Sequence, residues 1–209
     1  MSTDGARAYT QIKEKIINLE LLPGTVIHDI ALTEELGLGR TPIREALKLL
    51  EAERLVVTVP RRGIFVAHVS ITDLQQISEI RIELEGLTAR LAAERTSAKE
   101  LAEMKRCLQK SQDNASTGTA KERIAHDRVL HRLIAAATHN MFLEAEIERF
   151  YDLSARLWFL AIERLPAQDV DVLSHQQIIA AIEQHDAERA KTLMHEHIRN
   201  FQRTVKRAM

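Results

Sequence analysis

Apolar residues recur at spacings of three and four along most of the chain, which predicts helices that bury one face. In the first third, three such runs predict helices over about residues 6–22, 29–36 and 42–54. Two β-rich runs, 55–59 and 64–69, then flank a Pro-Arg-Arg-Gly turn, which predicts a hairpin. Three helices followed by a hairpin are the element order of a winged helix-turn-helix.

A tight turn is expected between the second and third helices. Gly37 can adopt the positive φ that ends a helix. Thr41 is placed to cap the next helix, with Pro42 at its first position, where the missing N–H costs nothing. The apolar positions of this third helix share one face: Ile43, Ala46, Leu47 and Leu50.

A different face of the third helix is basic. Its cations lie one turn apart and are Arg40, Arg44 and Lys48. Two short helices joined by a glycine-containing turn, the second with a basic face, are typical of a helix-turn-helix that places its second helix in the DNA major groove. Any surface helix can carry three solvated cations, so the spacing alone leaves that alternative open.

From Ser70 onwards the pattern is helical throughout. Capping-box patterns at 70–73, 97–100 and 119–122 each precede a long helical run. The expected helices span about residues 71–94, 98–114, 120–138, 141–164, 170–185 and 187–207, and the longest non-helical piece is expected from Asn114 to Gly118. The sequence therefore predicts a mainly α fold, with a winged helix-turn-helix over 1–69 and an antiparallel bundle of six helices over 70–209.

Composition and charge narrow the class of protein. The chain has 209 residues, enough for two modest domains, and 45% of them are apolar. The net charge of −1 argues against a polycation that coats nucleic acid. Between Arg40 and Arg62, however, there are six Arg/Lys and only three Glu, so positive charge is concentrated in the segment predicted to bind DNA. Cys107 is the only cysteine, which excludes a disulfide framework and a Cys-based zinc site. No signal segment or membrane-length apolar run is present, so we expect a cytoplasmic protein.

The sequence of the third helix and of the turn before it matches a known family motif. Residues 37–47 resemble the Gly-x-Ser-Arg-Thr-Pro-x-Arg-Glu-Ala-Leu signature of the GntR family of bacterial transcription regulators, with Gly39 in place of the usual serine. The likeness covers most of the first 70 residues, through Pro23-Gly24 upstream and Arg62-Gly63 downstream. It implies a homodimer on an inverted-repeat operator. Repression is the commoner outcome in such families, and activation stays open.

Each basic residue of this region has an expected role on double-stranded DNA. We expect Arg40 and Arg44 to read base edges, guanines above all. The residues expected to hold phosphates are Thr41, Lys48, Arg61 and Arg62. Gly63 would let the tip of the hairpin approach the groove.

Polar residues on inward helix faces indicate a second site. Asp127 and His131 are four apart and point to the same side of one helix, and His175 and His197 lie on the inward faces of two later helices. A divalent cation would satisfy one carboxylate and three imidazoles together, and such a donor set suits Zn, Ni, Fe, Mn or Co. The pattern alone is weak, because an inward histidine is more often a hydrogen-bonded core residue. Competing histidines are His126, His139, His185 and His195, of which His195 is expected to be solvated.

The bundle resembles the FCD ligand-binding domain of the FadR subgroup, in its six-helix VanR-like form. Arg81-Ile82-Glu83-Leu84-Glu85 fits an Arg-x-x-Leu-Glu pattern that this subgroup often shows. In its metal-dependent members the ligands are an Asp-x-x-x-His pair and two later histidines. The resemblance thus implies metal ligands at Asp127, His131, His175 and His197, and we favour zinc among the metals.

The same resemblance implies that the carboxylate of a small effector fills the open coordination positions of the ion, and that a nearby arginine pairs with another oxygen of the effector. Arg81 is the first candidate and Arg156 the second. The alternatives are an Arg81–Glu85 surface pair and a solvated Arg156. Trp158, Tyr151 and Phe159 either line the pocket or belong to the core.

Two other functions use the same donor set. A metalloenzyme is one, because an open cation can activate water. No second inward carboxylate is expected in the metal segments, and no Ser/His/Asp, Walker or Gly-x-Gly-x-x-Gly pattern occurs, so we expect a regulator, not an enzyme. A metal sensor without an organic ligand differs little in sequence and stays open.

Overall fold

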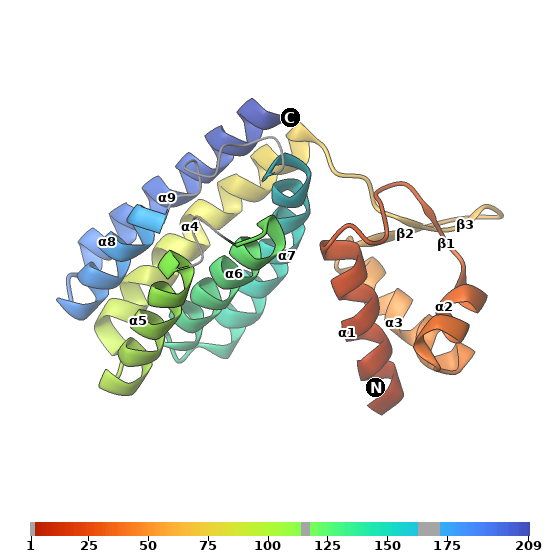
Figure 1. Cartoon of the computed structure of the whole chain (residues 1–209), viewed down its shortest axis with the longest axis horizontal. Coiled ribbons are helices and arrows are strands. Elements are labelled where there is room, and N and C mark those ends of the chain that lie inside the picture. Colours follow the sequence, from red (N-terminus) through yellow and green to blue (C-terminus); the bar gives the residue numbers. More distant parts are fainter. Residues whose placement is uncertain (1–2, 114–117, 163–171) are drawn as a thin grey trace. The chain divides into compact units, whose positions relative to one another are not determined.

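A computed structural model describes residues 3–113, 118–162 and 172–209 of the chain. The chain divides into two compact units, Met1–Val69 and Ser70–Met209 (Figure 1). Each unit buries its own apolar core. None of the helices in the described ranges is long and apolar enough to cross a membrane.

Three helices build the first unit: α1 (Thr3–Ile17), α2 (Asp29–Leu36) and α3 (Arg40–Ala52). The apolar faces of α1 and α3 pack against each other and bury Ile12, Ile16, Ile43 and Leu50 completely. The predicted span of α2 is confirmed, and Gly37 ends it with φ 62°. Helix α1 ends earlier than predicted, since Leu19 adopts the left-handed φ of 58°.

The start of α3 differs from the prediction. The helix begins at Arg40 with Gly39 as its N-cap, so the predicted capping role of Thr41 is wrong. Pro42 is then the third helical residue, and the first i→i−4 bond runs from the Ile43 N–H to the Gly39 carbonyl. The first N–H groups of a helix have no partner within the helix in any case, so Pro42 is tolerated there as well.

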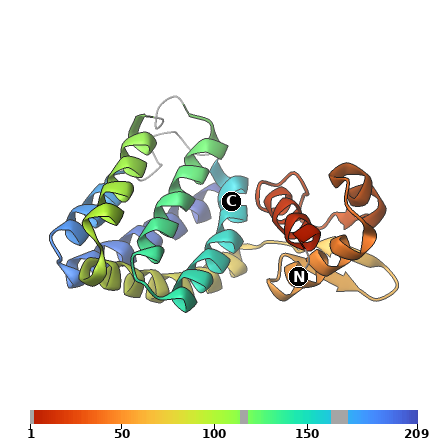
Figure 2. The same cartoon turned by 90° about the horizontal axis from the view of Figure 1, so that it is seen from below.

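A small antiparallel sheet completes this unit. Strands β2 (Val56–Val59) and β3 (Gly63–Val66) form the predicted hairpin, with Val57 paired to Phe65. A third strand, β1 (Val26–Ile27), pairs with the other side of β3 and gives the order β1-β3-β2. Two residues are too short for an alternating pattern, so the sequence did not predict β1. The β2–β3 hairpin projects beyond the helices in both views (Figures 1 and 2).

The described part of the second unit is a six-helix bundle, as predicted. Its helices are α4 (Ile71–Arg95), α5 (Ala98–Asp113), α6 (Ala120–Ala136), α7 (Met141–Ile162), α8 (Val172–Glu183) and α9 (Ala187–Ala208). Helix α4 packs along α9 and also contacts α6, α7 and α8, so it touches most of the other helices of the bundle. Most of the expected turn from Asn114 to Gly118 lies outside the described residues.

The capping boxes explain where the bundle helices begin. The Ser70 hydroxyl accepts from the Asp73 N–H at 3.1 Å, and the Asp73 carboxylate accepts from the Ser70 N–H at 2.8 Å. Thr119 and Glu122 repeat this arrangement at α6. Each box satisfies backbone N–H groups that the first helical turn leaves without a partner. The predicted starts of these helices are therefore confirmed.

Candidate metal centre and DNA-reading helix

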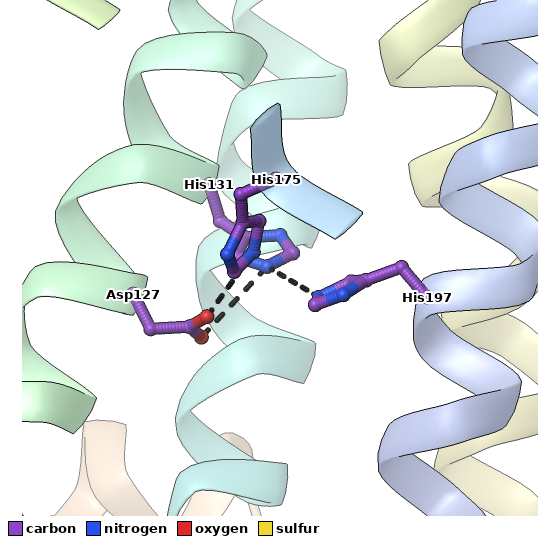
Figure 3. A group of neighbouring side chains, drawn as sticks. All are labelled: Asp127, His131, His175 and His197. Carbon is purple, nitrogen blue, oxygen red and sulfur yellow. Dashed lines mark hydrogen bonds and ion pairs between the residues drawn. The ribbon is translucent and has the colours of Figure 1, made fainter. Parts of the chain in front are cut away.

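Four polar side chains from three helices meet inside the bundle (Figure 3). Asp127 and His131 lie one turn apart on α6, His175 lies on α8 and His197 on α9. One donor atom from each lies within 4.8 Å of all the others, and all four residues are buried. The structure brings together all four residues that the sequence singled out.

The spacing of these atoms suits a shared cation. The Nε2 atoms of His131 and His197 are 3.3 Å apart, and Nε2 of His175 is 3.3 Å from Oδ1 of Asp127. Ligands held about 2.0–2.2 Å from one ion, at tetrahedral or octahedral angles, lie about 3.0–3.5 Å apart. One carboxylate and three imidazoles are also a donor set that Zn, Ni, Fe, Mn and Co accept. The residues present therefore fit a metal ion.

Partners outside the four hold the imidazole rings in place. Glu85 of α4 contacts Nδ1 of His131. The Ser174 hydroxyl lies 2.8 Å from Nδ1 of His197. Because Nδ1 of each of these two histidines is engaged, Nε2 is left to face the centre of the cluster.

The sequence missed part of this surrounding shell. Tyr151 was expected only as a lining or core aromatic, but its hydroxyl donates to Asp127 at 2.6 Å. The expectation of no second inward carboxylate covered only the helices that carry the four residues, and it left out two buried carboxylates on other helices: Glu85 of α4 and Asp152 of α7 are both 1% exposed. A buried carboxylate needs a cation or donor beside it, and Glu85 has Arg81 one turn away on its own helix. That i, i+4 pair was the signal available in the sequence.

The pKa values of two imidazoles of the cluster are shifted in opposite directions, that of His197 downwards and that of His131 upwards. Burial lowers the pKa of His197 well below its usual range, and the neighbouring His175 and His131 rings lower it further. Burial also acts to lower the pKa of His131, but the carboxylates of Glu85 and Asp127 outweigh it and raise that pKa. A neutral His197 offers the lone pair that a metal ion requires.

Arg81 lies beside the cluster and is 3% exposed. Its Nε and Nη2 atoms lie 2.5 Å from Glu85, and its Nη1 donates to Ser154 at 2.7 Å. The guanidinium also lies over the rings of Tyr151 and Phe201, at 5.2 and 5.4 Å. Although burial raises the pKa of the Glu85 carboxyl, Arg81 and the neighbouring imidazole hold it well below its usual range. The pair with Glu85 exists, but the interpretation of it as a surface pair is wrong.

Arg156 also lies in the bundle interior and is 1% exposed. Burial lowers its pKa to about 10, against an opposing effect of Asp73. The alternative of a solvated Arg156 is therefore wrong.

The competing histidines lie outside the four-residue group formed within the described ranges. His139 is exposed and its ring lies 2.9 Å from Glu100, and His185 directs Nδ1 to the Ala93 carbonyl at 2.7 Å. His195 was expected to be solvated, which is wrong. Its ring packs over Gly86 of α4, where a β-carbon would collide with it.

The basic face that the sequence predicts to read DNA is exposed on the first unit. Arg40, Arg44 and Lys48 are all exposed along α3, on a different face from its buried apolar residues. Thr41 is exposed at the start of this helix, and the hairpin tip presents the exposed residues Arg61, Arg62 and Gly63. Positive φ values at Arg61 (63°) and Gly63 (111°) turn the chain at this tip.

One ion pair links the two helices of the helix-turn-helix. Nε and Nη2 of Arg44 lie 3.3 and 3.2 Å from the same carboxylate oxygen of Asp29, the first residue of α2. The side chain of Arg44 nevertheless remains 66% exposed. One edge of the Arg44 guanidinium therefore contacts Asp29, and the rest of the side chain is accessible to solvent.

Two family models match consecutive parts of the chain. Residues 5–66 match bacterial regulatory proteins of the gntR family, and residues 76–200 match the FCD domain. The chain belongs to the GntR family. It is a DNA-binding transcription regulator with an FCD domain, and its relatives are regulators of transcription and not enzymes.

Related GntR proteins cover nearly the whole chain. The HTH-type transcriptional repressor GlaR of Escherichia coli is 31% identical over 212 residues, which span 94% of this chain and 92% of GlaR. YdhC of Bacillus subtilis, an uncharacterized HTH-type transcriptional regulator, is 28% identical over 184 residues, 88% of this chain and 82% of YdhC. The solved structure of E. coli McbR/YncC is similar with a TM-score of 0.90 at 23% identity, over 99% of both chains, and so shares the fold.

Proposed function

We propose that this GntR-family regulator is a repressor that holds a divalent metal ion in its bundle. Binding of a small carboxylate effector at this ion would change the affinity of the protein for DNA. The observation that carries the proposal is the buried Asp127/His131/His175/His197 cluster, in a chain that also bears an exposed basic reading helix. Residues 1–69 would bind DNA, and residues 70–209 would bind metal and effector and form the dimer. Members of this family act as dimers, and we extend this to a homodimer on an inverted-repeat operator.

On DNA, Arg40 and Arg44 would read base edges from the major groove. Their exposure on one side of α3 supports this assignment. The residues proposed to hold phosphates are Thr41, Lys48, Arg61 and Arg62, all of them exposed. Gly63 carries no side chain at the hairpin tip, so the backbone there can approach a groove closely.

In the bundle, Asp127, His131, His175 and His197 would hold the ion, with zinc favoured among Zn, Ni, Mn, Fe and Co. When bound, the ion would supply positive charge and open coordination positions to a carboxylate. Glu85 and Ser174 would keep the His131 and His197 rings turned so that Nε2 faces inwards.

Arg81 is the residue proposed to bind the effector carboxylate, with Arg156 as the second candidate. Arg81 supports this role by its place, because its Glu85 partner directly contacts His131 of the cluster. An incoming carboxylate at Arg81 would compete with Glu85 for the guanidinium. Such a competition would connect effector binding to the orientation of His131, and through α4 to the packing of the bundle.

Metal content tests the proposed ligand set. We expect His131→Ala combined with His197→Ala to lose the bound metal on elemental analysis, whereas His139→Ala, at an exposed histidine outside the cluster, should keep it. Stoichiometric metal retained in the double variant would move the site elsewhere. Thermal unfolding of each protein after chelation separates a folding defect from loss of the site.

A thermal-shift screen of organic acids tests the effector. A ligand that binds only the folded protein raises its melting temperature, so we expect a shift in the metal-loaded form that chelation abolishes. The intrinsic fluorescence of Trp158, which packs on Phe201 close to Arg81, should respond in the same way. An identical response after chelation contradicts the proposed coordination, and a change in DNA affinity with metal alone would favour a metal sensor.

A further inference from the structure

We infer that Asp29 is a specificity-determining residue, whose carboxylate orients Arg44 to read one base pair. The inference rests on the proposed role of Arg44 in base reading. It assigns a function in DNA recognition to an acidic residue of α2, the helix that precedes the reading helix.

The geometry places one carboxylate oxygen against one edge of the guanidinium. Oδ2 of Asp29 lies 3.3 Å from Nε and 3.2 Å from Nη2 of Arg44. Asp29 is the first residue of α2, so the backbone of that helix holds it in place. Its side chain is only 31% exposed, against 66% for Arg44. The less exposed partner, fixed at the start of a helix, therefore holds the more exposed one.

This pair contributes little to stability, because exposed ion pairs are screened by water and salt. Its effect lies in the conformation of Arg44. A long side chain that is immobilised only on binding lowers the affinity through lost rotamer freedom, and a side chain already held in place loses less.

The donors that remain match a guanine edge. An arginine has five N–H donors, and the contact with Asp29 uses the Nε side of the fork. The end of the guanidinium stays free, and there one N–H of Nη1 and the second N–H of Nη2 point in parallel. Such a pair of donors binds O6 and N7 of guanine. The carboxylate thus selects which edge of the guanidinium faces the groove.

The charge of Asp29 acts in the same direction. A carboxylate beside Arg44 repels phosphate oxygens, so it disfavours the binding of this cation to the DNA backbone at any sequence. Removing the charge should release Arg44 for such backbone contacts. The affinity for unrelated DNA then stays equal or rises while discrimination falls.

The test is a parallel selection from a randomised duplex DNA library with the full-length wild-type protein and Asp29→Asn. We expect the wild-type protein to select a defined motif and Asp29→Asn to select the same motif with one base pair per half-site degenerate. In titrations, discrimination at that pair should fall by about 5- to 150-fold, the range of a bidentate arginine contact. The affinity of Asp29→Asn for unrelated duplex should be unchanged or higher.

Two matched variants test whether the effect depends on a carboxylate at this position and not on the overall charge of α2. Asp29→Glu keeps the negative charge at the start of α2 and should recover most of the selectivity. Glu34→Gln removes an exposed charge from the same helix and should leave the motif unchanged. If Asp29→Asn selects the complete wild-type motif, or weakens binding to all duplexes equally, the inference is overturned. If the wild-type protein selects no motif at all, it is instead the proposed DNA-reading role that fails.

Discussion

The carboxylate of Glu85 contacts Nδ1 of His131, and each of these side chains is 2% exposed. A ring nitrogen that donates to a carboxylate leaves the other nitrogen with its lone pair, so this contact presents Nε2 to the centre of the cluster. Glu85 is held in turn by Arg81, at 2.5 Å. The orientation of one proposed metal ligand thus depends on two residues of α4 that are outside the ligand set.

Replacing Glu85 by Gln should therefore lower the metal affinity by about 10- to 100-fold, the usual effect of removing such a partner. Competition against a chromophoric chelator measures this affinity. Glu83→Gln changes an exposed carboxylate two residues earlier on α4 and should leave the affinity at the wild-type value. Equal affinities of the two variants would show that Glu85 does not orient His131, and thermal unfolding of both apo-proteins reveals any loss of fold.

Lys48 and Arg44 should respond differently to removal, because phosphate contacts carry no sequence information and base contacts do. Lys48→Ala should weaken binding to all duplexes alike and reduce the slope of log affinity against log salt by about 1. Arg44→Ala should cost about 1–3 kcal/mol on the selected motif and relax one base pair. Fluorescence anisotropy at several salt concentrations measures both. Arg106→Ala, an exposed cation of the bundle, is the control, and an equal loss for Arg44→Ala on random DNA would refute base reading.

Gly86 should tolerate a methyl group better when His195 is removed. In a helix Ala is favoured over Gly by about 1 kcal/mol, but at this position the added β-carbon collides with the His195 ring. We expect Gly86→Ala to stabilise His195→Ala by about 1 kcal/mol and to stabilise the wild-type protein less or destabilise it. Urea unfolding of the four proteins measures the coupling, which should exceed about 0.5 kcal/mol. Additive effects would mean that the His195 ring does not restrict a side chain at position 86.

Acid should remove the stabilisation that Glu100 provides. Hydrogen bonds from the Ser97 hydroxyl and backbone N–H, and one from His139, lower its pKa from 4.5 to about 2. Because the pKa is lower in the folded state, the stabilisation is complete above pH 4.5 and is lost as the pH falls towards 2. The difference in unfolding free energy between the wild-type protein and Glu100→Gln should thus shrink below pH 4.5. Glu103→Gln on the same helix is the control, and a difference that is independent of pH would contradict the linkage.

Local chemistry accounts for most of what the sequence predicted correctly. The span of α2, the capping boxes at Ser70 and Thr119, and the left-handed Gly37 depend on residues within a few positions of one another. Such interactions can be read from spacing, because they form within one helical turn or one turn of the chain. The start of α3 was missed by two residues because Gly39 and Thr41 can both precede a helix, and the structure uses Gly39.

Helical periodicity offered the four residues of the cluster as candidates, and the family resemblance selected them from among the competing histidines. Periodicity places Asp127 and His131 on one side of α6, and His175 and His197 on inward faces, but it cannot show that these faces meet. Their distances depend on how α6, α8 and α9 pack together. The sequence by itself determined which residues are available to a metal ion.

Only the tertiary structure decided what surrounds those residues. The contact of Glu85 with His131, the burial of Arg81, the pairing of β1 with β3 and the packing of His195 on Gly86 join elements far apart in the chain. Side-chain chemistry is the same for a surface pair and a buried pair, so a pattern along one helix cannot distinguish them. The difference arises from the neighbouring helices that exclude water, and their positions follow from the packing of the whole bundle.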